Sequence, residues 1–260
     1  MMHSRYKRVR SLLLRQILRW GSVILGGIFI IWVFYEIILS ADLFKLTQFK
    51  VSGNFHVRSQ ELKSIFAPML QRNLLTLDLD PLMRRVRDHP WVQEVSIKKV
   101  LPDTLWVHIQ ERTPAAVVES KGRFHWVDRA GVVLGPAVLK NGGSKPLPHI
   151  NGVILAGLLR RDPEQVGRLQ TGLALIALIQ SHQSSDAFGM DIGEPLVLDM
   201  SRGQRDPKLY WEGYTVRFGE GAYEEKWKSF MAIQSDLRSR ELAPEEIDLR
   251  FTDQVIVKTF

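Results

Sequence analysis

The stretch ILRWGSVILGGIFIIWVFYEIIL, residues 17–39, decides how the rest of this chain is arranged. It is 23 residues long and is interrupted by two charges, Arg19 and Glu36, each close to one end. A helix of that length measures about 35 Å, and the hydrocarbon core of a bilayer is about 30 Å thick. The stretch therefore predicts one membrane-spanning helix near the N-terminus.

Charge predicts the direction in which this helix crosses. Residues 1–20 carry six Lys or Arg side chains and no acidic residue, and short basic segments stay on the cytoplasmic side. We therefore expect a cytoplasmic tail over residues 1–18, a membrane-spanning helix over residues 19–40 and an exported remainder. The residues that we expect to form the apolar surface of the anchor are Val23, Ile24, Leu25, Ile28, Phe29, Ile30, Ile31 and Trp32.

A cleaved signal peptide is the competing interpretation of the same region. Signal peptides have an apolar segment of about 7–15 residues that ends in a small-x-small cleavage site. Here the apolar run is longer, and the best candidate site, Leu39-Ser40-Ala41, begins with a bulky residue. An uncleaved anchor is favoured.

Composition narrows the classes of function. The formal net charge is +7, but the first 20 residues contribute six of those charges, which leaves 29 basic and 28 acidic residues in the rest of the chain. The basic balance therefore indicates membrane topology and attraction to anionic lipid, and no nucleic-acid partner is expected. The chain has no cysteine, which excludes disulfides, cysteine-ligated metals and a cysteine nucleophile.

Residues 45–113 read as a small α+β unit. Leu46–Ser52 alternates in polarity as a strand does, and Asp80-Pro81 is typical of a helix start. An earlier helix has one apolar stripe, and two alternating strands, residues 91–100 and 103–111, flank a turn at Pro102-Asp103. The order β-α-α-β-β predicts one three-stranded sheet with two helices covering one face. The stripe consists of Leu62, Ile65, Phe66, Met69 and Leu70.

Residues 114–260 read as a larger mixed α/β unit. Apolar periodicity predicts helices over residues 163–180 and 222–240. The chain closes with two strands that we expect to be antiparallel, and a loop is expected over Gly135–Pro148. The predicted strands cover residues 115–119, 124–127, 132–134, 196–200, 208–211, 215–218, 247–251 and 255–258.

No pattern in the chain predicts a catalytic, metal or cofactor site. The seven histidines are scattered, and none has a His, Asp or Glu neighbour at metal-ligand spacing. Ser96-Ile97-Lys98-Lys99 matches the S-x-x-K string of penicillin-binding enzymes, which requires a helix. In a strand, Ser96 and Lys99 point to opposite faces, so we interpret the match as chance.

Several local strings, taken in order, point to one family. They are Phe49-Lys50-Val51-Ser52-Gly53-Asn54, Asn73-Leu74-Leu75-Thr76-Leu77-Asp78, Pro90-Trp91-Val92, Leu101-Pro102-Asp103-Thr104-Leu105, Glu111-Arg112-Thr113-Pro114-Ala115, Val127-Asp128-Arg129-Ala130-Gly131 and Ile247-Asp248-Leu249-Arg250-Phe251. Each string alone is weak, but seven in this order behind one anchor are specific. Along nearly its whole length the chain resembles the FtsQ/DivIB bacterial cell-division proteins.

The resemblance implies a fold and a role for each unit. Residues 45–113 would be a POTRA domain and residues 114–260 an FtsQ-type β domain. Members of the family are non-enzymatic scaffolds at the division septum, where they link early and late cell-division proteins in the cell inner (plasma) membrane. The expected partners are FtsB/DivIC-like and FtsL-like proteins on the β domain, other divisome proteins on the POTRA domain, and membrane lipid around the anchor, with no small-molecule substrate.

The expected partner-binding residues lie at the C-terminal end. A terminal strand tends to lie at a sheet edge, and an edge can accept a strand from a partner. Val255, Ile256 and Val257 would supply that edge. The residues alone favour ordinary core and edge roles, whereas the resemblance places Arg250 and Phe251 in the partner contact, on a penultimate strand that spans residues 247–251.

Two alternatives share the same anchor. One is a membrane-tethered cell-wall enzyme, which would acylate or cleave a peptidoglycan-like substrate. The other is a transport component that carries a POTRA domain. The transport alternative predicts several POTRA copies or a β-barrel, and the segment after residue 113 indicates neither.

Overall fold

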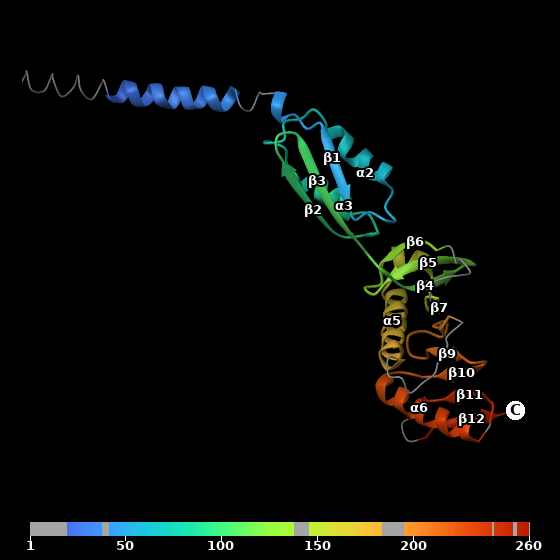
Figure 1. The fold of residues 1–260 in the computed structure, drawn as a ribbon. Coiled ribbons are helices and arrows are strands. Elements are labelled where there is room, and N and C mark those ends of the chain that lie inside the picture. The colour runs from blue at the N-terminus through green and yellow to red at the C-terminus, as the bar shows by residue number, and fades with distance from the viewer. Residues whose placement is uncertain are drawn as a thin grey trace, which may run out of the picture. The chain divides into compact units, whose positions relative to one another are not determined.

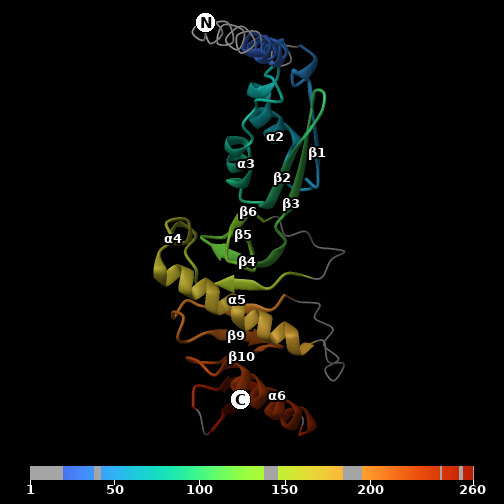
Figure 2. The same ribbon diagram turned by 90° about the vertical axis from the view of Figure 1, so that its left-hand side faces the viewer.

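The computed structural model describes residues 20–37, 42–137, 146–183, 195–240, 242–251 and 254–259. The chain divides into two compact units, Met1–Glu111 and Arg112–Phe260. Each unit is considered separately below. Figures 1 and 2 show their elements in two views at right angles.

The N-terminal apolar run forms a helix over Trp20–Ile37. Among the described residues, one helix is long enough and apolar enough to cross a membrane, and it is this one. Its mean hydropathy is 1.8 over 18 residues. All of the predicted anchor residues lie on its surface: Val23, Ile24, Leu25, Ile28, Phe29, Ile30, Ile31 and Trp32. The ends predicted at residues 17–19 and 38–40 lie outside the described residues.

The first unit has the predicted order of strand, two helices and two strands. Its sheet has the order β1-β3-β2, with β1 parallel and β2 antiparallel to β3. Figure 2 shows α2 and α3 on one side of this sheet. The elements are η1 (Asp42–Phe44), β1 (Gln48–Ser52), α2 (Ser59–Phe66), η2 (Ala67–Met69), α3 (Asp80–Arg87), β2 (Val92–Val100) and β3 (Thr104–Glu111).

The alternation along β3 decides which face of this sheet is covered. Leu105, Val107 and Ile109 are buried, whereas the residues between them are exposed. Leu62 and Phe66 of α2 are also buried, as the predicted stripe requires. Pro68 limits the stripe, because α2 ends at Phe66 and the chain continues as the short 3-10 helix η2.

The strands described in the second unit form one mixed sheet of nine. Its order is β12-β11-β10-β9-β8-β7-β4-β5-β6. The strands are β4 (Pro114–Ser120), β5 (Arg123–Asp128), β6 (Val133–Pro136), β7 (His149–Asn151), β8 (Val197–Asp199), β9 (Lys208–Trp211), β10 (Tyr214–Arg217), β11 (Pro244–Asp248) and β12 (Ile256–Thr259). The helices are α4 (Leu155–Leu159), α5 (Pro163–Gln183) and α6 (Tyr223–Ser239).

The core of the second unit lies between this sheet and its two long helices. One buried row crosses the sheet in register, through Leu198, Leu209, Val216 and Ile247. Helix α6 packs on the same face, where the Trp227 ring meets the Trp211 ring edge-on at 6.0 Å. This packing supports the sheet as far as its C-terminal edge. Both α5 and α6 are seen beside the sheet in Figure 2.

Two elements of the second unit were not predicted. Strand β7 lies in the middle of the sheet and is parallel to both of its neighbours, β4 and β8. Helix α4 is one short turn before α5. Both come from residues 149–159, where three strand residues and five helical residues are too few to show a period of 2 or 3.6. The predicted loop at 135–148 falls partly outside the described residues.

Candidate partner-binding edge

Strand β12 forms one edge of the nine-stranded sheet. It pairs antiparallel with β11, with Ile247 opposite Val257 and Asp248 opposite Ile256. The backbone groups on the far side of an edge strand point away from the sheet and can pair with another strand. The structure therefore places the predicted C-terminal strand where strand addition is geometrically available.

The side chains of this edge divide between the two faces of the sheet. Val255 and Val257 are partly buried and pack against the core. Ile256 points the other way and is 39% exposed. On the same side as Ile256, the ammonium group of Lys258 lies 3.1 Å from the carboxylate of Glu246 on β11. The outward-facing surface of the edge thus combines an exposed isoleucine with a paired lysine.

The prediction that a penultimate strand spans residues 247–251 is wrong. Strand β11 begins at Pro244 and ends at Asp248, so Arg250 and Phe251 follow it. Asp248 causes this ending, because its Oδ1 accepts a hydrogen bond from the backbone N–H of Arg250 at 3.0 Å. The N–H of Arg250 is therefore satisfied inside the loop. In a longer strand, that N–H would be available to a neighbouring strand.

Arg250 is held by Asp248 through its side chain as well. Its Nη2 lies 2.6 Å from Oδ2, and its Nε donates to Oδ1 at 2.9 Å. The Asp248 side chain is 8% exposed and that of Arg250 is 40% exposed. The guanidinium carbon also lies 5.9 Å from the centre of the exposed Phe251 ring. Arg250 and Phe251 therefore form one exposed pair. Asp248, which lies opposite Ile256 on β12, holds this pair in place.

This ion pair keeps both of its groups in the charged form. Burial by itself would raise the pKa of Asp248, but hydrogen bonds from the Arg250 side chain and amide, and the charges of Arg250 and Arg217, lower that pKa below 3.8. The hydrogen bond to Asp248 likewise raises the pKa of Arg250. Both groups are charged at neutral pH.

Asp248 and Gly219 are two residues of this site that sequence reasoning missed. Gly219 has a φ of +66°, and a Cβ there would lie 2.8 Å from Cγ of Arg250. The stem of Arg250 therefore lies directly against the backbone that follows β10. The sequence signal was weak: an acidic residue at a polar position of the predicted strand, two positions before an arginine.

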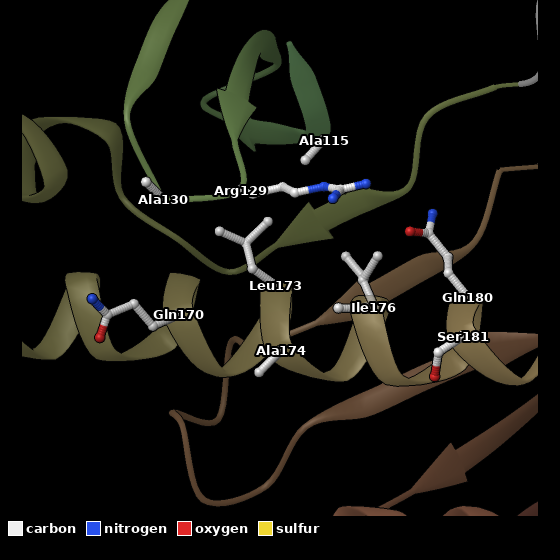
Figure 3. A pocket seen from close by; sticks show the side chains of 10 residues that line it. Ala115, Arg129, Ala130, Gln170, Leu173, Ala174, Ile176, Gln180 and Ser181 are labelled. Carbon is white, nitrogen blue, oxygen red and sulfur yellow. The ribbon is translucent and has the colours of Figure 1, made fainter. Parts of the chain in front are cut away.

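A separate open cavity of about 630 Å³ lies between α5 and the β4 and β5 region. Figure 3 shows Leu173 and Ile176 pointing from α5 toward the side that carries Ala115 and Arg129. None of the predicted partner-binding residues lines this cavity.

The enzyme-like string has the geometry expected of a strand. Ser96 lies on the exposed face of β2, opposite His108 of β3. Lys99 points to the other face, where its Nζ donates to the carbonyl oxygen of Leu75 at 2.9 Å. Over the residues that the structure describes, no three His, Asp or Glu side chains are close enough to hold a metal ion.

In the part of the chain that the structure describes, one apolar helix, a β-α-α-β-β unit and a larger sheet that ends in the edge strand β12 define a POTRA-bearing protein with one candidate membrane anchor. A family model described as "POTRA domain, FtsQ-type" matches residues 44–112. A second, described as "Cell division protein FtsQ/DivIB, C-terminal", matches residues 116–250. The chain belongs to the FtsQ/DivIB family of cell division proteins.

Similar full-length proteins support this assignment. A "Cell division protein FtsQ" of Geotalea daltonii is 28% identical over 253 residues, which cover 94% of this chain and 89% of the relative. One from a Geobacter species is 27% identical over 229 residues, covering 87% and 80%. One from Allochromatium vinosum is 28% identical over 242 residues, covering 91% and 85%. The likeness therefore includes the anchor region and both units.

Proposed function

We propose that this cell division protein is a non-enzymatic scaffold that links early and late division proteins at the septum. In this proposal the N-terminal tail is cytoplasmic and both folded units lie on the outer side of the membrane. The second unit binds FtsB/DivIC-like and FtsL-like partners by strand addition at β12, and Arg250, Phe251, Val255, Ile256 and Val257 form the contact.

The observation that supports this proposal is the position of β12. It is an edge strand with an exposed isoleucine, and the Arg250–Phe251 pair lies beside it. Main-chain hydrogen bonds to an added strand supply affinity, while side chains beside the edge supply specificity. The two inward valines make the edge rigid by packing it on the core.

A pair of proline variants tests strand addition. In an antiparallel ladder, the N–H groups of successive residues point alternately to the partner strand and to the outside. Of Ile256→Pro and Val257→Pro, one therefore removes an N–H that faces β11 and the other removes an N–H on the free edge. Thermal unfolding of the full chain identifies the second, because that variant keeps the β11–β12 ladder.

The free-edge variant should fail to co-purify an FtsB-like partner while its unfolding temperature stays close to that of the parent protein. Retained co-purification by this variant would show that the partner does not bind as an added strand. The alanine variant at the same position keeps the backbone N–H and is the matched control for loss of the side chain.

The cellular role is tested by depletion. Cells that lose the protein should grow as filaments, and a fluorescent fusion should collect at midcell. A fusion that lacks residues 45–113 should lose its midcell position if the POTRA domain recruits the protein. Uniform membrane fluorescence of the full-length fusion would count against a septal role.

The absence of enzymatic activity is part of the proposal and has its own test. Full-length protein in detergent is incubated with labelled penicillin and with peptidoglycan, beside a penicillin-binding enzyme as a positive control. Neither covalent label nor released fragments should appear. Labelling that disappears in Ser96→Ala would establish the enzyme alternative.

A further inference from the structure

The exposed face of the three-stranded sheet carries a group of residues that the proposed function does not use. Lys50, Trp106 and Lys98 lie side by side on β1, β3 and β2, in direct register. Val100 and Leu101 follow at the tip of the β2–β3 hairpin. We call these five residues the hairpin-tip patch.

The patch is apolar and basic, and it is open to solvent. Leu101 is 55% exposed, and Val100 and Trp106 are each 45% exposed. The ammonium group of Lys98 lies 5.8 Å from the centre of the Trp106 ring, so the cation and the indole form one unit. Exposed aliphatic side chains beside tryptophan and lysine are the composition of a membrane-interface surface.

The other half of the same sheet face has a different composition. The next row consists of Ser52, His108 and Ser96, and the row after it pairs Gln110 with Glu94. Ser52 Oγ and His108 Nδ1 lie 3.0 Å apart, so these polar groups bond to one another. Apolar side chains and cations are therefore confined to the hairpin end of the face.

That end is also the end at which the chain arrives from the anchor. The backbone N–H of Thr47 donates to the carbonyl oxygen of Asp103 in the hairpin turn at 2.9 Å. Just before it, the carbonyl oxygen of Phe44 accepts a hydrogen bond from the N–H of Leu74 at 2.7 Å. The chain is therefore attached to the folded unit from η1 onward.

A short tether then limits how far the patch can be from the bilayer. Asp42, the first residue of η1, is five residues after Ile37, the last described residue of the apolar helix. Five residues span at most about 18 Å. The headgroup layer adds about 5–8 Å beyond the hydrocarbon core on each side. A segment this short allows the hairpin end to reach the headgroups.

The local charges leave the two lysines available for an anion. Asp42 is paired with Lys45 at 2.7 Å. The carboxylate of Asp103 is engaged by the hydroxyl groups of Thr47 and Thr104. Lys98 contacts an aromatic ring, and Lys50 is an exposed cation on the same row.

We propose that the hairpin-tip patch binds the anionic headgroups of the leaflet in which the anchor ends. Leu101 and Val100 enter the interface, Trp106 lies at headgroup level, and Lys50 and Lys98 bind lipid phosphates. This contact would fix the orientation of the first unit on the membrane, and it is independent of the β12 edge.

The absence of native cysteine allows the contact to be measured in the full chain. Leu101→Cys is spin-labelled and placed in nanodiscs that contain phosphatidylglycerol or phosphatidylcholine alone. Phe55→Cys is the matched control: it is 89% exposed and apolar, but it lies at the opposite end of the sheet, where its N–H donates to Glu111. The readout is the accessibility of the label to oxygen relative to a water-soluble nickel chelate.

The label at position 101 should favour oxygen in the phosphatidylglycerol discs, and the label at position 55 should favour the nickel chelate in both. Combined Lys50→Glu and Lys98→Glu should weaken the contact about tenfold or more. Combined Lys63→Glu and Arg85→Glu, a matched charge change on the helical side, should leave it unchanged. Equal water exposure at positions 101 and 55 would overturn the proposal, as would protection that needs an added protein or that is unaffected by the two lysines.

Discussion

The carboxylate of Glu111, at the end of β3, holds His56 in the loop that follows β1. Its Oε2 accepts the backbone N–H of His56 at 2.9 Å and also lies 2.9 Å from Nδ1 of the same residue. Oε1 accepts the N–H groups of Phe55 and Val57 at 2.7 and 2.9 Å. One buried carboxylate thus accepts hydrogen bonds from three successive backbone N–H groups and fixes the connection from β1 to α2.

Glu111→Gln should destabilise the first unit in a pH-dependent way. Burial alone would raise the pKa of Glu111, but the hydrogen bonds from Val57, His56 and Phe55 lower it below its usual 4.5. A depressed folded-state pKa stabilises the protein above the unfolded value, and that stabilisation is lost as pH falls through the folded value. The variant should lose about 1–3 kcal/mol at pH 7, and the difference should close as pH falls through the folded-state pKa of Glu111.

Chemical unfolding of the two proteins at several pH values measures this difference. Glu61→Gln, whose carboxylate pairs with His89 on the surface of the same unit, should change stability far less. A gap between parent and Glu111→Gln that stays constant with pH would contradict the assigned charge.

Asp248→Asn should weaken the support of the partner-binding edge. The change removes the charge that binds Arg250 from a nearly buried position, so about 1–3 kcal/mol of stability should be lost at neutral pH. Because the folded-state pKa of Asp248 is depressed, this difference should be present above the unfolded pKa and should be lost as pH falls through the lower folded-state pKa. Asp236→Asn, which breaks an exposed pair with Arg240, is the control and should have little effect.

Gly219→Ala should cost more stability than the backbone strain of a positive φ alone, because the added Cβ would also displace the Arg250 side chain. Gly219 and Gly221 both have a φ of +66°, but a Cβ at Gly221 meets no atom within 4 Å. Gly221→Ala therefore reports backbone strain alone, about 1 kcal/mol. Gly219→Ala should be more destabilising and should also reduce partner binding. Equal losses in the two variants would show that the contact with Arg250 has no energetic role.

Lys258→Glu should reduce partner binding more than an equivalent change elsewhere. Lys258 and Lys228 are both exposed and both pair with a glutamate, at 3.1 and 2.9 Å, but Lys228 lies on α6. Each reversal removes a surface pair of little stability, so the unfolding temperatures should be alike. Co-purification with an FtsB-like partner should fall for Lys258→Glu alone. Similar binding by the two variants would place the contact away from β12.

Trp227→Ala should unfold the second unit most readily of these variants. Trp227 is fully buried and its ring meets those of Trp211, Phe218 and Phe230. A loss of about 3–5 kcal/mol is expected from the cavity and the lost transfer free energy. Tyr210→Ala removes a half-exposed ring from the opposite face of the sheet and should have a much smaller effect. Thermal unfolding followed by circular dichroism compares the two.

The local polarity pattern predicted an element correctly where its side chains alternate between the core and the solvent. The alternation of Leu105, Val107 and Ile109 predicted both the strand and its buried face, because the period of a strand is two. Strand β9 lies over the predicted residues Lys208–Trp211 for the same reason. Length and hydropathy were enough to predict the apolar helix, because few backbone structures can satisfy their hydrogen bonds inside a bilayer.

Pattern failed where a distant or a polar partner decided the structure. Strand β7 has three residues and exists because β4 and β8 pair with it from both sides. Strand β11 stops at Asp248 because the Asp248 carboxylate accepts a hydrogen bond from the N–H of Arg250. Leu249, beyond the end of the strand, is still buried. Alternation records burial and contains no information about such a hydrogen bond.

By itself, the sequence determined one apolar span, a β-α-α-β-β unit and a terminal strand, because hydropathy and short-range periodicity encode these features. The tertiary structure decided that β12 lies at the outer edge of a nine-stranded sheet, since edge position depends on which strands pair. It also decided that Arg250 is bound by Asp248 and that Lys50, Trp106 and Lys98 share one row. Those relationships join residues from separate segments, and only packing brings them together.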